Sequence, residues 1–430
     1  MTTPPAAQTV LTALELARAG RFAELKEMFT AQLRPMVAPE ALRAGWEAEL
    51  RRQGSISSIG APVTEPADNG VVVVKILVSC ARGAFGVVAS VTGQGELAAL
   101  QLTPPSATQP VAPWEPPEYT DPDALDEQDV TLGVGPLAVS GALTLPRDSE
   151  PRTRHPGVVL LAGSGPLDRD ETIGRNKPFK DIAWGLATRG AAVLRFDKVT
   201  YAHPREARQA RDFTLNDEYL PHALAAIELL QDNPNVDSGR VFLLGHSLGG
   251  TVAPRIAAAE PSVTGLIVLA GGAEPLHWAL VRQVRYLASL DPETEAASRA
   301  AIEALTEKAR LVDGPDLSLS TPADRLPLGT PASYWLDLRG YDPAVAAAEL
   351  GKPMLILQGG RDYQATVDDD LARWTAALGE RPDVTVRVYP AHNHLFAPGR
   401  GPCTPAEYEP AQHVDPAVIA DIADWMGDGA

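Results

Sequence analysis

The stretch Val241-Phe-Leu-Leu-Gly-His-Ser-Leu-Gly-Gly250 decides the fold. Four apolar residues before Gly245 indicate a short buried strand, and the small apolar residues after Gly250 indicate a packed helix. Between them, residues 245–249 fit the G-x-S-x-G pattern of a nucleophile elbow, whose glycines permit a turn sharp enough to expose a serine at the end of a strand. The alternative is a glycine-rich turn between core elements, so the context along the chain has to decide.

The composition predicts a globular protein without affinity for polyanions. The 430 residues are 45% hydrophobic, which is enough for two or three domains with cores. The net charge of −18 argues against nucleic-acid binding and against an anionic membrane surface. The first residues show neither a basic n-region nor an apolar h-region, and no apolar run approaches about 18 residues, so we expect a cytoplasmic protein without membrane insertion. Cys80 and Cys403 match no metal or redox spacing, and we expect neither a metal nor a cofactor.

Residues 1–103 predict a small α+β accessory domain. Helical periodicity over 8–52 is followed by strand candidates at 55–64, 71–80, 85–92 and 97–102. This segment contains no His, and its nine Lys/Arg balance nine Asp/Glu. We therefore expect a packing, substrate-covering or dimerising role, with a homodimer through this domain as the suggested partner interaction. Residues 104–127 are rich in Pro and acids, which predicts an extended linker.

Residues 128–430 alternate strands and helices. Most strand candidates are continuous apolar runs, as in parallel strands that are covered on both faces. The pattern predicts a doubly wound, mostly parallel sheet of eight strands. The candidates are 129–132, 137–145, 157–162, 191–196, 241–244, 265–269, 353–358 and 384–389. Residues 273–352 occupy a connection for which about a dozen residues would suffice. We predict a helical lid over the elbow, and a purely structural appendage is the alternative.

A serine hydroxyl needs a base to remove its proton, and the base needs an acid to orient it. Asp362 follows the strand at 353–358 and should therefore stand at the same edge of the sheet as Ser247. We predict Asp362 as this acid, with a loop acid paired to Arg361 as the alternative. The acids at 368–370 are typical of a helix N-terminus, where negative charge suits the helix dipole.

Two histidines follow the last strand, His392 and His394. Both cannot be the base. His394 precedes Leu395-Phe396, an apolar pair that would anchor its loop and fix its imidazole. We predict His394 as the base and keep His392 as its rival.

An oxyanion requires two preorganised N–H donors. One is expected to be the amide of Leu248, directly after the nucleophile. The other is expected from the loop at 162–166, where we choose Ser164 over Gly165. Arg169, further along this loop, fits an internal ion-pair network better than a contact to a substrate carboxylate. Aromatic residues of the expected lid are candidates to line an acyl pocket, namely Trp278, Tyr334 and Trp335.

The second domain resembles an α/β-hydrolase of the serine carboxylesterase type, in particular a group of bacterial esterases. The resemblance rests on Gly163-Ser-Gly-Pro-Leu-Asp-Arg-Asp-Glu171, Asn176-Lys-Pro-Phe-Lys-Asp181, Leu194-Arg-Phe-Asp-Lys198, the elbow at 245–250, and Asn393-His-Leu-Phe396. The accessory domain of these esterases, known as DUF3887, is similar to residues 1–103 in length and in helix-then-strand order.

The resemblance implies a serine ester hydrolase that acts on short to medium acyl esters through an acyl-enzyme. Ser247 would be the nucleophile, His394 the base and Asp362 the orienting acid. A peptidase, thioesterase or acyltransferase would use the same three groups, so these activities remain alternatives. A non-catalytic binding protein on a hydrolase scaffold is the alternative from another class.

Overall fold

The computed structural model describes residues 5–34, 37–66, 70–108, 114–147, 154–210, 212–290, 292–379 and 381–427. The chain divides into two compact units, Met1–Pro113 and Trp114–Ala430. The second unit thus begins within the segment 104–127, all of which the composition predicts to be a linker. The reason is that Trp114 packs edge-on against Trp184 at 5.0 Å between ring centroids and donates a hydrogen bond to Asp181.

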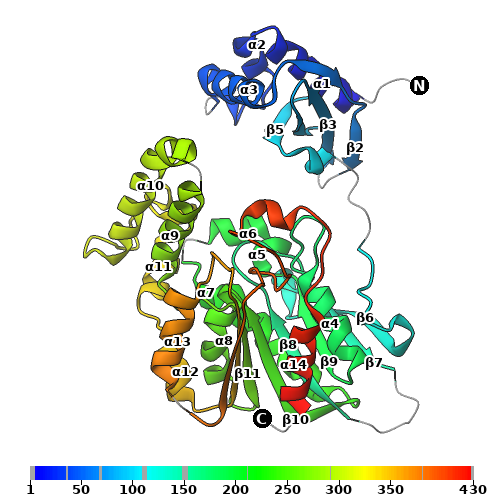
Figure 1. Ribbon diagram of the computed structural model, residues 1–430, viewed down its shortest axis with the longest axis vertical. Helices are drawn as coiled ribbons and strands as arrows, with labels where there is room; N and C mark the ends of the chain where they lie inside the picture. Colours follow the sequence, from blue (N-terminus) through cyan, green and yellow to red (C-terminus); the bar gives the residue numbers. More distant parts are fainter. Residues whose placement is uncertain are drawn as a thin grey trace. The chain divides into compact units, whose positions relative to one another are not determined.

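The first unit combines helices with an antiparallel sheet (Figure 1). Its described residues form the helices α1 (Pro5–Arg18), α2 (Phe22–Glu27) and α3 (Pro39–Gln53), and the strands β1 (Ile56–Ile59), β2 (Val63–Pro66), β3 (Val72–Cys80), β4 (Ala84–Val91) and β5 (Leu97–Thr103). The strand order is β1-β3-β4-β5, with β2 paired to β3. Val10 and Leu14 of α1 are buried one helical turn apart, and Trp46 of α3 meets Phe85 of β4 edge-on at 5.6 Å between ring centroids.

The second unit is built on one sheet. In its described residues the strands are β6 (Leu125–Leu132), β7 (Val139–Pro146), β8 (His155–Leu161), β9 (Ala192–Phe196), β10 (Val236–His246), β11 (Gly265–Leu269), β12 (Met354–Gly359) and β13 (Val384–Tyr389). Their order is β13-β12-β11-β10-β8-β9-β7-β6. The strands from β13 to β9 are parallel, and β7 and β6 add an antiparallel edge. The predicted doubly wound, mostly parallel eight-stranded sheet is confirmed.

Both faces of this sheet are covered by helices (Figure 1). Neighbouring residues of a strand point to opposite faces, so Val159 and Leu243 enter one core while Val158 and Phe242 enter the other. The first core lies under α7 (Leu215–Asp232), α8 (Leu248–Ala259), α12 (Pro343–Leu350) and α13 (Ala372–Leu378). The second lies under α4 (Pro178–Thr188) and α14 (Pro416–Gly427). This double burial explains why the strands are continuous apolar runs.

A helical insertion separates β11 from β12. It contains α9 (Leu276–Ser289), α10 (Pro292–Asp313), α11 (Ala332–Arg339) and α12. A small core of its own includes Leu326 and the fully buried Trp335.

The short helices α5 (Val199–Ala202) and α6 (Pro204–Gln209) follow β9. None of the helices in the described ranges is both long and apolar enough to cross a bilayer.

Candidate active site

Ser247 occupies a tight turn between β10 and α8. Its φ of 52° and ψ of −119° are rare outside glycine and are typical of the strained turn of a nucleophile elbow. The flanking glycines are required by space. A Cβ on Gly245 would lie 2.2 Å from the carbonyl oxygen of Gly249, and a Cβ on Gly249 would lie 1.9 Å from that of Leu161. The turn therefore has the strand–turn–helix context that the G-x-S-x-G pattern needs.

Asp362, which follows β12, contacts His394, which follows β13. Oδ2 of Asp362 lies 2.6 Å from Nδ1 of His394, and both side chains are buried. The other carboxylate oxygen accepts hydrogen bonds from the amides of Gln364 at 2.7 Å and Ala365 at 3.2 Å. The loop thus fixes the carboxylate, and the carboxylate fixes the orientation of the imidazole.

The rival residues have other partners. Arg361 pairs with Glu407 at 3.1 Å rather than with Asp362. Nε2 of His392 lies 3.1 Å from Asp415. The acids at 368–370 lie in a single π-helical turn, Val367–Leu371, as their interpretation as a helix start requires.

His246 connects Ser247 to His394. It directly precedes Ser247 in the chain, and its ring centroid lies 4.6 Å from that of His394. Its Nε2 lies 2.9 Å from the carbonyl oxygen of His394. Among the described residues, no hydrogen bond joins the Ser247 hydroxyl to His394; without substrate, such contacts are often long. The structure therefore pairs Asp362 with His394 and packs this pair against the residue next to Ser247.

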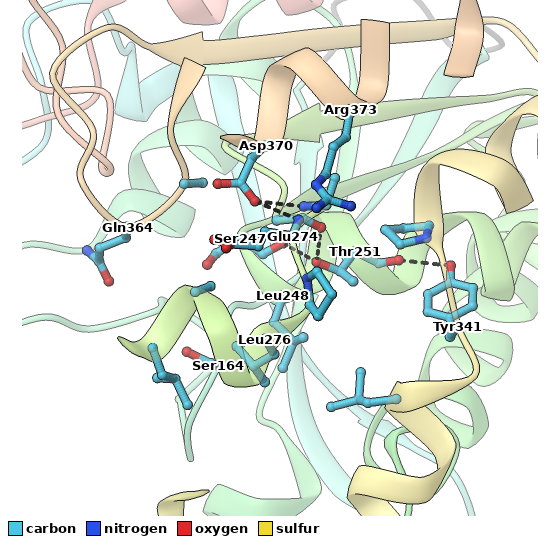
Figure 2. A pocket seen from close by; sticks show the side chains of 18 of the residues that line it. Ser164, Ser247, Leu248, Thr251, Glu274, Leu276, Tyr341, Gln364, Asp370 and Arg373 are labelled. Atoms are coloured by element: carbon cyan, nitrogen blue, oxygen red, sulfur yellow. Dashed lines mark hydrogen bonds between the residues drawn. The ribbon is translucent and has the colours of Figure 1, made fainter. Parts of the chain in front are cut away.

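The two residues expected to supply oxyanion donors line the same cavity as Ser247. The amide of Leu248 is the first of α8, a position without an intrahelical acceptor. Ser164 is exposed and, like Leu248, lines the same cavity as Ser247 (Figure 2). The amide of Gly163 is not available, because it donates to Oε1 of Glu171 at 2.7 Å.

A cavity of about 100 Å³ opens at Ser247. Its apolar wall comes largely from the insertion, through Leu276 and Leu280 of α9 and Leu338 of α11. Ser247 lies between Gln364 and Thr251 in the view of Figure 2, with Ser164 below and Asp370 and Arg373 above. The cavity is further lined by Leu248, Gly272, Ala273, Glu274, Pro275, Ala279, Gln283, Tyr341, Asp342, Pro343 and Ala365.

The acids that line the cavity already have donors. Arg282 binds both Glu274 and Asp370 at 2.8 Å. Asp342 caps α12 by accepting two of its amides. Arg373 also lines the cavity, and it has no hydrogen bond or ion pair with any described residue. The lining therefore offers a substrate one unpaired cation and no unpaired carboxylate among the described side chains.

The aromatic residues that we expected in the pocket lie elsewhere. Trp335 is fully buried in the core of the insertion. Tyr334 donates its hydroxyl to Glu218 at 2.7 Å, and Trp278 donates its indole N–H to Asp313 at 2.7 Å. The prediction was wrong because sequence placed these residues in the right segment but could not give the direction of their side chains.

Three other charged or titratable residues near the site, Arg169, Glu171 and His246, form contacts within the protein. Arg169 donates to Asp129 at 2.6 Å and to the carbonyl oxygen of Gly141 at 2.7 Å, an internal bracing of the loop. Glu171 and His246 form a buried pair that sequence reasoning did not identify. Within the described parts of the chain, no group of three His, Cys, Asp or Glu side chains could hold a metal ion.

Fold and site geometry agree with the comparisons to known proteins. Residues 172–397, more than half of the chain, match the family described as serine aminopeptidase, S33. The chain belongs to this α/β-hydrolase family. It is 38% identical to esterase EstD of Thermotoga maritima over 346 residues, which are 80% of this chain and 77% of that protein.

Solved structures with a similar fold include Est1E from Butyrivibrio proteoclasticus. That likeness has a TM-score of 0.46 and 16% identity, and it covers 70% of this chain and 98% of the other. A hypothetical protein from Pseudomonas aeruginosa has a TM-score of 0.46 and 14% identity, with 75% of this chain and 96% of the other covered.

Proposed function

We propose that the protein is a serine esterase that cleaves short acyl esters through an acyl-enzyme. The observation that carries the proposal is the buried Asp362–His394 pair, 2.6 Å apart and adjacent to the strained turn of Ser247. The 38% identity to an esterase supports the same reaction class.

In the proposed mechanism, Ser247 attacks the ester carbonyl carbon while His394 takes the hydroxyl proton. Asp362 keeps the imidazole oriented and balances the charge of the imidazolium. The amides of Leu248 and Ser164 donate to the oxyanion. His394 then gives the proton to the leaving alcohol. In the second half-reaction, water attacks the acyl-enzyme with the same base, and the carboxylic acid is released.

The cavity supports a short acyl group. Its volume of about 100 Å³ is below the roughly 150 Å³ that accommodates one benzene molecule in an engineered cavity. Because its walls from α9 and α11 are apolar, the acyl chain gains burial there. We propose that these helices act as the lid of the site.

An aminopeptidase is the second candidate, because the family description names this activity. Such an enzyme has to recognise a free α-amino group, which an unpaired carboxylate would do best. Glu274 and Asp370 are both engaged by Arg282, and Asp342 caps a helix. This arrangement favours the esterase over the aminopeptidase. Thioesterase and acyltransferase activities share the acyl-enzyme and differ only in leaving group or acceptor.

For the first unit we propose a non-catalytic accessory role, similar to that of DUF3887 domains. Because residues 1–103 have a net charge of zero, this unit is a candidate for self-association, with a homodimer as the expected assembly. Sedimentation of the full chain over a range of concentrations tests this proposal. A strictly monomeric chain would contradict it.

Hydrolysis of nitrophenyl esters by wild type and Ser247→Ala tests the reaction. We expect turnover to fall about a millionfold. The matched control is Ser262→Ala, an exposed serine bonded to Glu260, which should keep wild-type activity. A parallel panel of acyl-CoA and aminoacyl amides should react more slowly than the esters. Wild-type-like ester hydrolysis by Ser247→Ala would remove the assignment, as would faster cleavage of the amides.

A further inference from the structure

Glu171 lies against the oxyanion loop in an unusual backbone conformation. Its φ of 52° is in the left-handed region, and its side chain is only 2% exposed. Oε1 of Glu171 accepts the amide proton of Gly163 at 2.7 Å. A Cβ on Gly163 would lie 2.9 Å from this oxygen and 3.2 Å from Cβ of Ser247. Gly163 is thus held between the Glu171 carboxylate and the proposed nucleophile.

The same carboxylate oxygen binds His246. Nδ1 of His246 lies 3.0 Å from Oε1 of Glu171, and Nε2 lies 2.9 Å from the carbonyl oxygen of His394. Both neighbours are acceptors. A neutral imidazole has only one N–H, so two such contacts beside an ionised Glu171 require the doubly protonated ring. The geometry therefore makes His246 an imidazolium, paired with the carboxylate of Glu171.

The electrostatic surroundings of His246 agree with this protonation state. Burial by itself would lower the pKa of His246, but the charge and hydrogen bond of Glu171, with the contact to the His394 carbonyl, raise it above its usual value. The negative charge of Asp362 acts in the same direction. The other groups that face the ring are the imidazole of His394 at 4.6 Å and the Phe179 ring at 6.5 Å, both between centroids.

The carbonyl group of Gly163 is also held by buried side chains. Its carbonyl oxygen accepts hydrogen bonds from Nζ of Lys198 at 2.7 Å and from the hydroxyl of Tyr219 at 3.0 Å. Lys198 is in turn paired with Glu218 at 2.9 Å. Both polar groups of the Gly163 backbone are therefore fixed by buried side chains. The next amide along the chain is that of Ser164, the proposed oxyanion donor.

We propose that Glu171 and His246 form a charged positioning pair, which sets the oxyanion loop and the His394 backbone relative to Ser247. The inference rests on the proposed function, since it concerns the geometry of that same site. Glu171 fixes the loop by accepting the amide of Gly163, and His246, bound to Glu171, fixes the backbone of His394 through its carbonyl oxygen. Neither side chain takes part in proton transfer, because the ring nitrogens of His246 are both occupied.

Steady-state kinetics of Glu171→Gln test the positioning role. A neutral amide cannot keep His246 charged, so either the Gly163 amide or the His394 carbonyl loses its partner. We expect kcat to fall about a hundredfold, as for a displaced oxyanion donor, with KM changed less than about threefold. The matched control is Asp170→Asn, which removes another buried carboxylate of the same loop, one that binds Arg195 and Lys177. This control should be less stable but should keep the wild-type kcat.

The protonation state is tested independently of activity, first on the wild-type chain. The chain has eight histidines, and ¹⁵N-histidine labelling resolves their ring nitrogens by NMR. At about pH 8, where an ordinary histidine is neutral, the imidazole of His246 should have both nitrogens protonated. His246→Gln should remove that signal, and Glu171→Gln should convert it to a neutral ring.

The outcomes separate this inference from the proposed function. An active wild type with unchanged kcat in Glu171→Gln, or with a neutral His246 at about pH 8, overturns the positioning pair alone. A wild type that hydrolyses no ester overturns the proposed function, while the NMR signature would still report on the pair. An equal loss of kcat in Asp170→Asn would reduce the effect to general destabilisation and would also overturn the inference.

Discussion

The site contains two carboxylate–imidazole pairs whose rings lie 4.6 Å apart, and they differ in how the imidazole is used. His394 contacts Asp362 through Nδ1, and within the described residues its Nε2 forms no hydrogen bond. His246 has an acceptor at each nitrogen. A ring with one free nitrogen can accept and return a proton, whereas a ring bonded at both can only hold its neighbours in place. Similar residue pairs, packed together, therefore have different predicted roles.

Replacement of His394 should produce the largest difference between the two pairs. His394→Ala removes the proposed base, and we expect kcat to fall about a millionfold. His246→Gln removes only the positioning contact and should cost about a hundredfold. Turnover numbers for the two variants, measured on one nitrophenyl ester, provide the check. Equal losses would mean that the two rings do not have separate roles.

Replacement of the two acids should lower kcat in the same order as replacement of the two histidines, with a smaller loss for Asp362 than for His394. Asp362→Asn should lower kcat about ten-thousandfold, because the amide favours the wrong tautomer of His394. Glu171→Gln should lower it about a hundredfold, as argued above. The double variant should lose less than the product of the single losses, because both substitutions disturb His394. A strictly multiplicative loss would show that the two pairs act independently.

Stability should depend on pH through the Glu171–His246 pair. The pKa of His246 is raised in the folded chain, so its contribution is complete below the unfolded value of about 6.5 and is lost as pH rises through the folded pKa. The difference in Tm between wild type and Glu171→Gln should therefore be large at about pH 6 and smaller at about pH 9. Thermal unfolding at both pH values measures it.

Asp170→Asn is the control for that measurement. Burial by itself would raise the pKa of Asp170, but Arg195 and Lys177 lower it below its usual value. Its contribution is therefore complete above about pH 4 and is lost only as pH falls further. Its Tm deficit should be the same at about pH 6 and about pH 9. A parallel decline in both variants would contradict the assignment of the pH dependence to His246.

The smallest effect is expected for His392, the rival base. Its Nε2 faces Asp415 rather than the acid of the candidate triad. His392→Gln should change kcat less than about threefold. The same nitrophenyl ester assay suffices. A loss comparable to that of His394→Ala would transfer the role of base to His392.

The sequence predicted the sheet and one of the two pairs. Continuous apolar runs and the elbow at Ser247 carry local signals, since double burial and a sharp turn each restrict which residues fit. Asp362 and His394 were found because both follow strands that end at the same edge of the sheet. This rule locates residues by topology and needs no side-chain orientation.

The Glu171–His246 pair could not be predicted in this way. Glu171 lies in a loop with a left-handed backbone, and nothing in its neighbours indicates that it would turn inward toward His246. The same limit explains the error at Trp278, Tyr334 and Trp335, whose positions in the insertion were right but whose directions depend on tertiary packing. A charged residue within a motif such as 163–171 is the signal that could have suggested a buried role.

Covalent labelling by a fluorophosphonate, read out by intact mass, tests the central claim most directly. Wild type should gain one adduct, which peptide mapping should place on Ser247. His246→Gln should label more slowly than wild type but to completion, and His394→Ala should not label on the same time scale. An adduct at another residue, or rapid labelling of His394→Ala, would contradict the assignment of Ser247 as the nucleophile and His394 as its base.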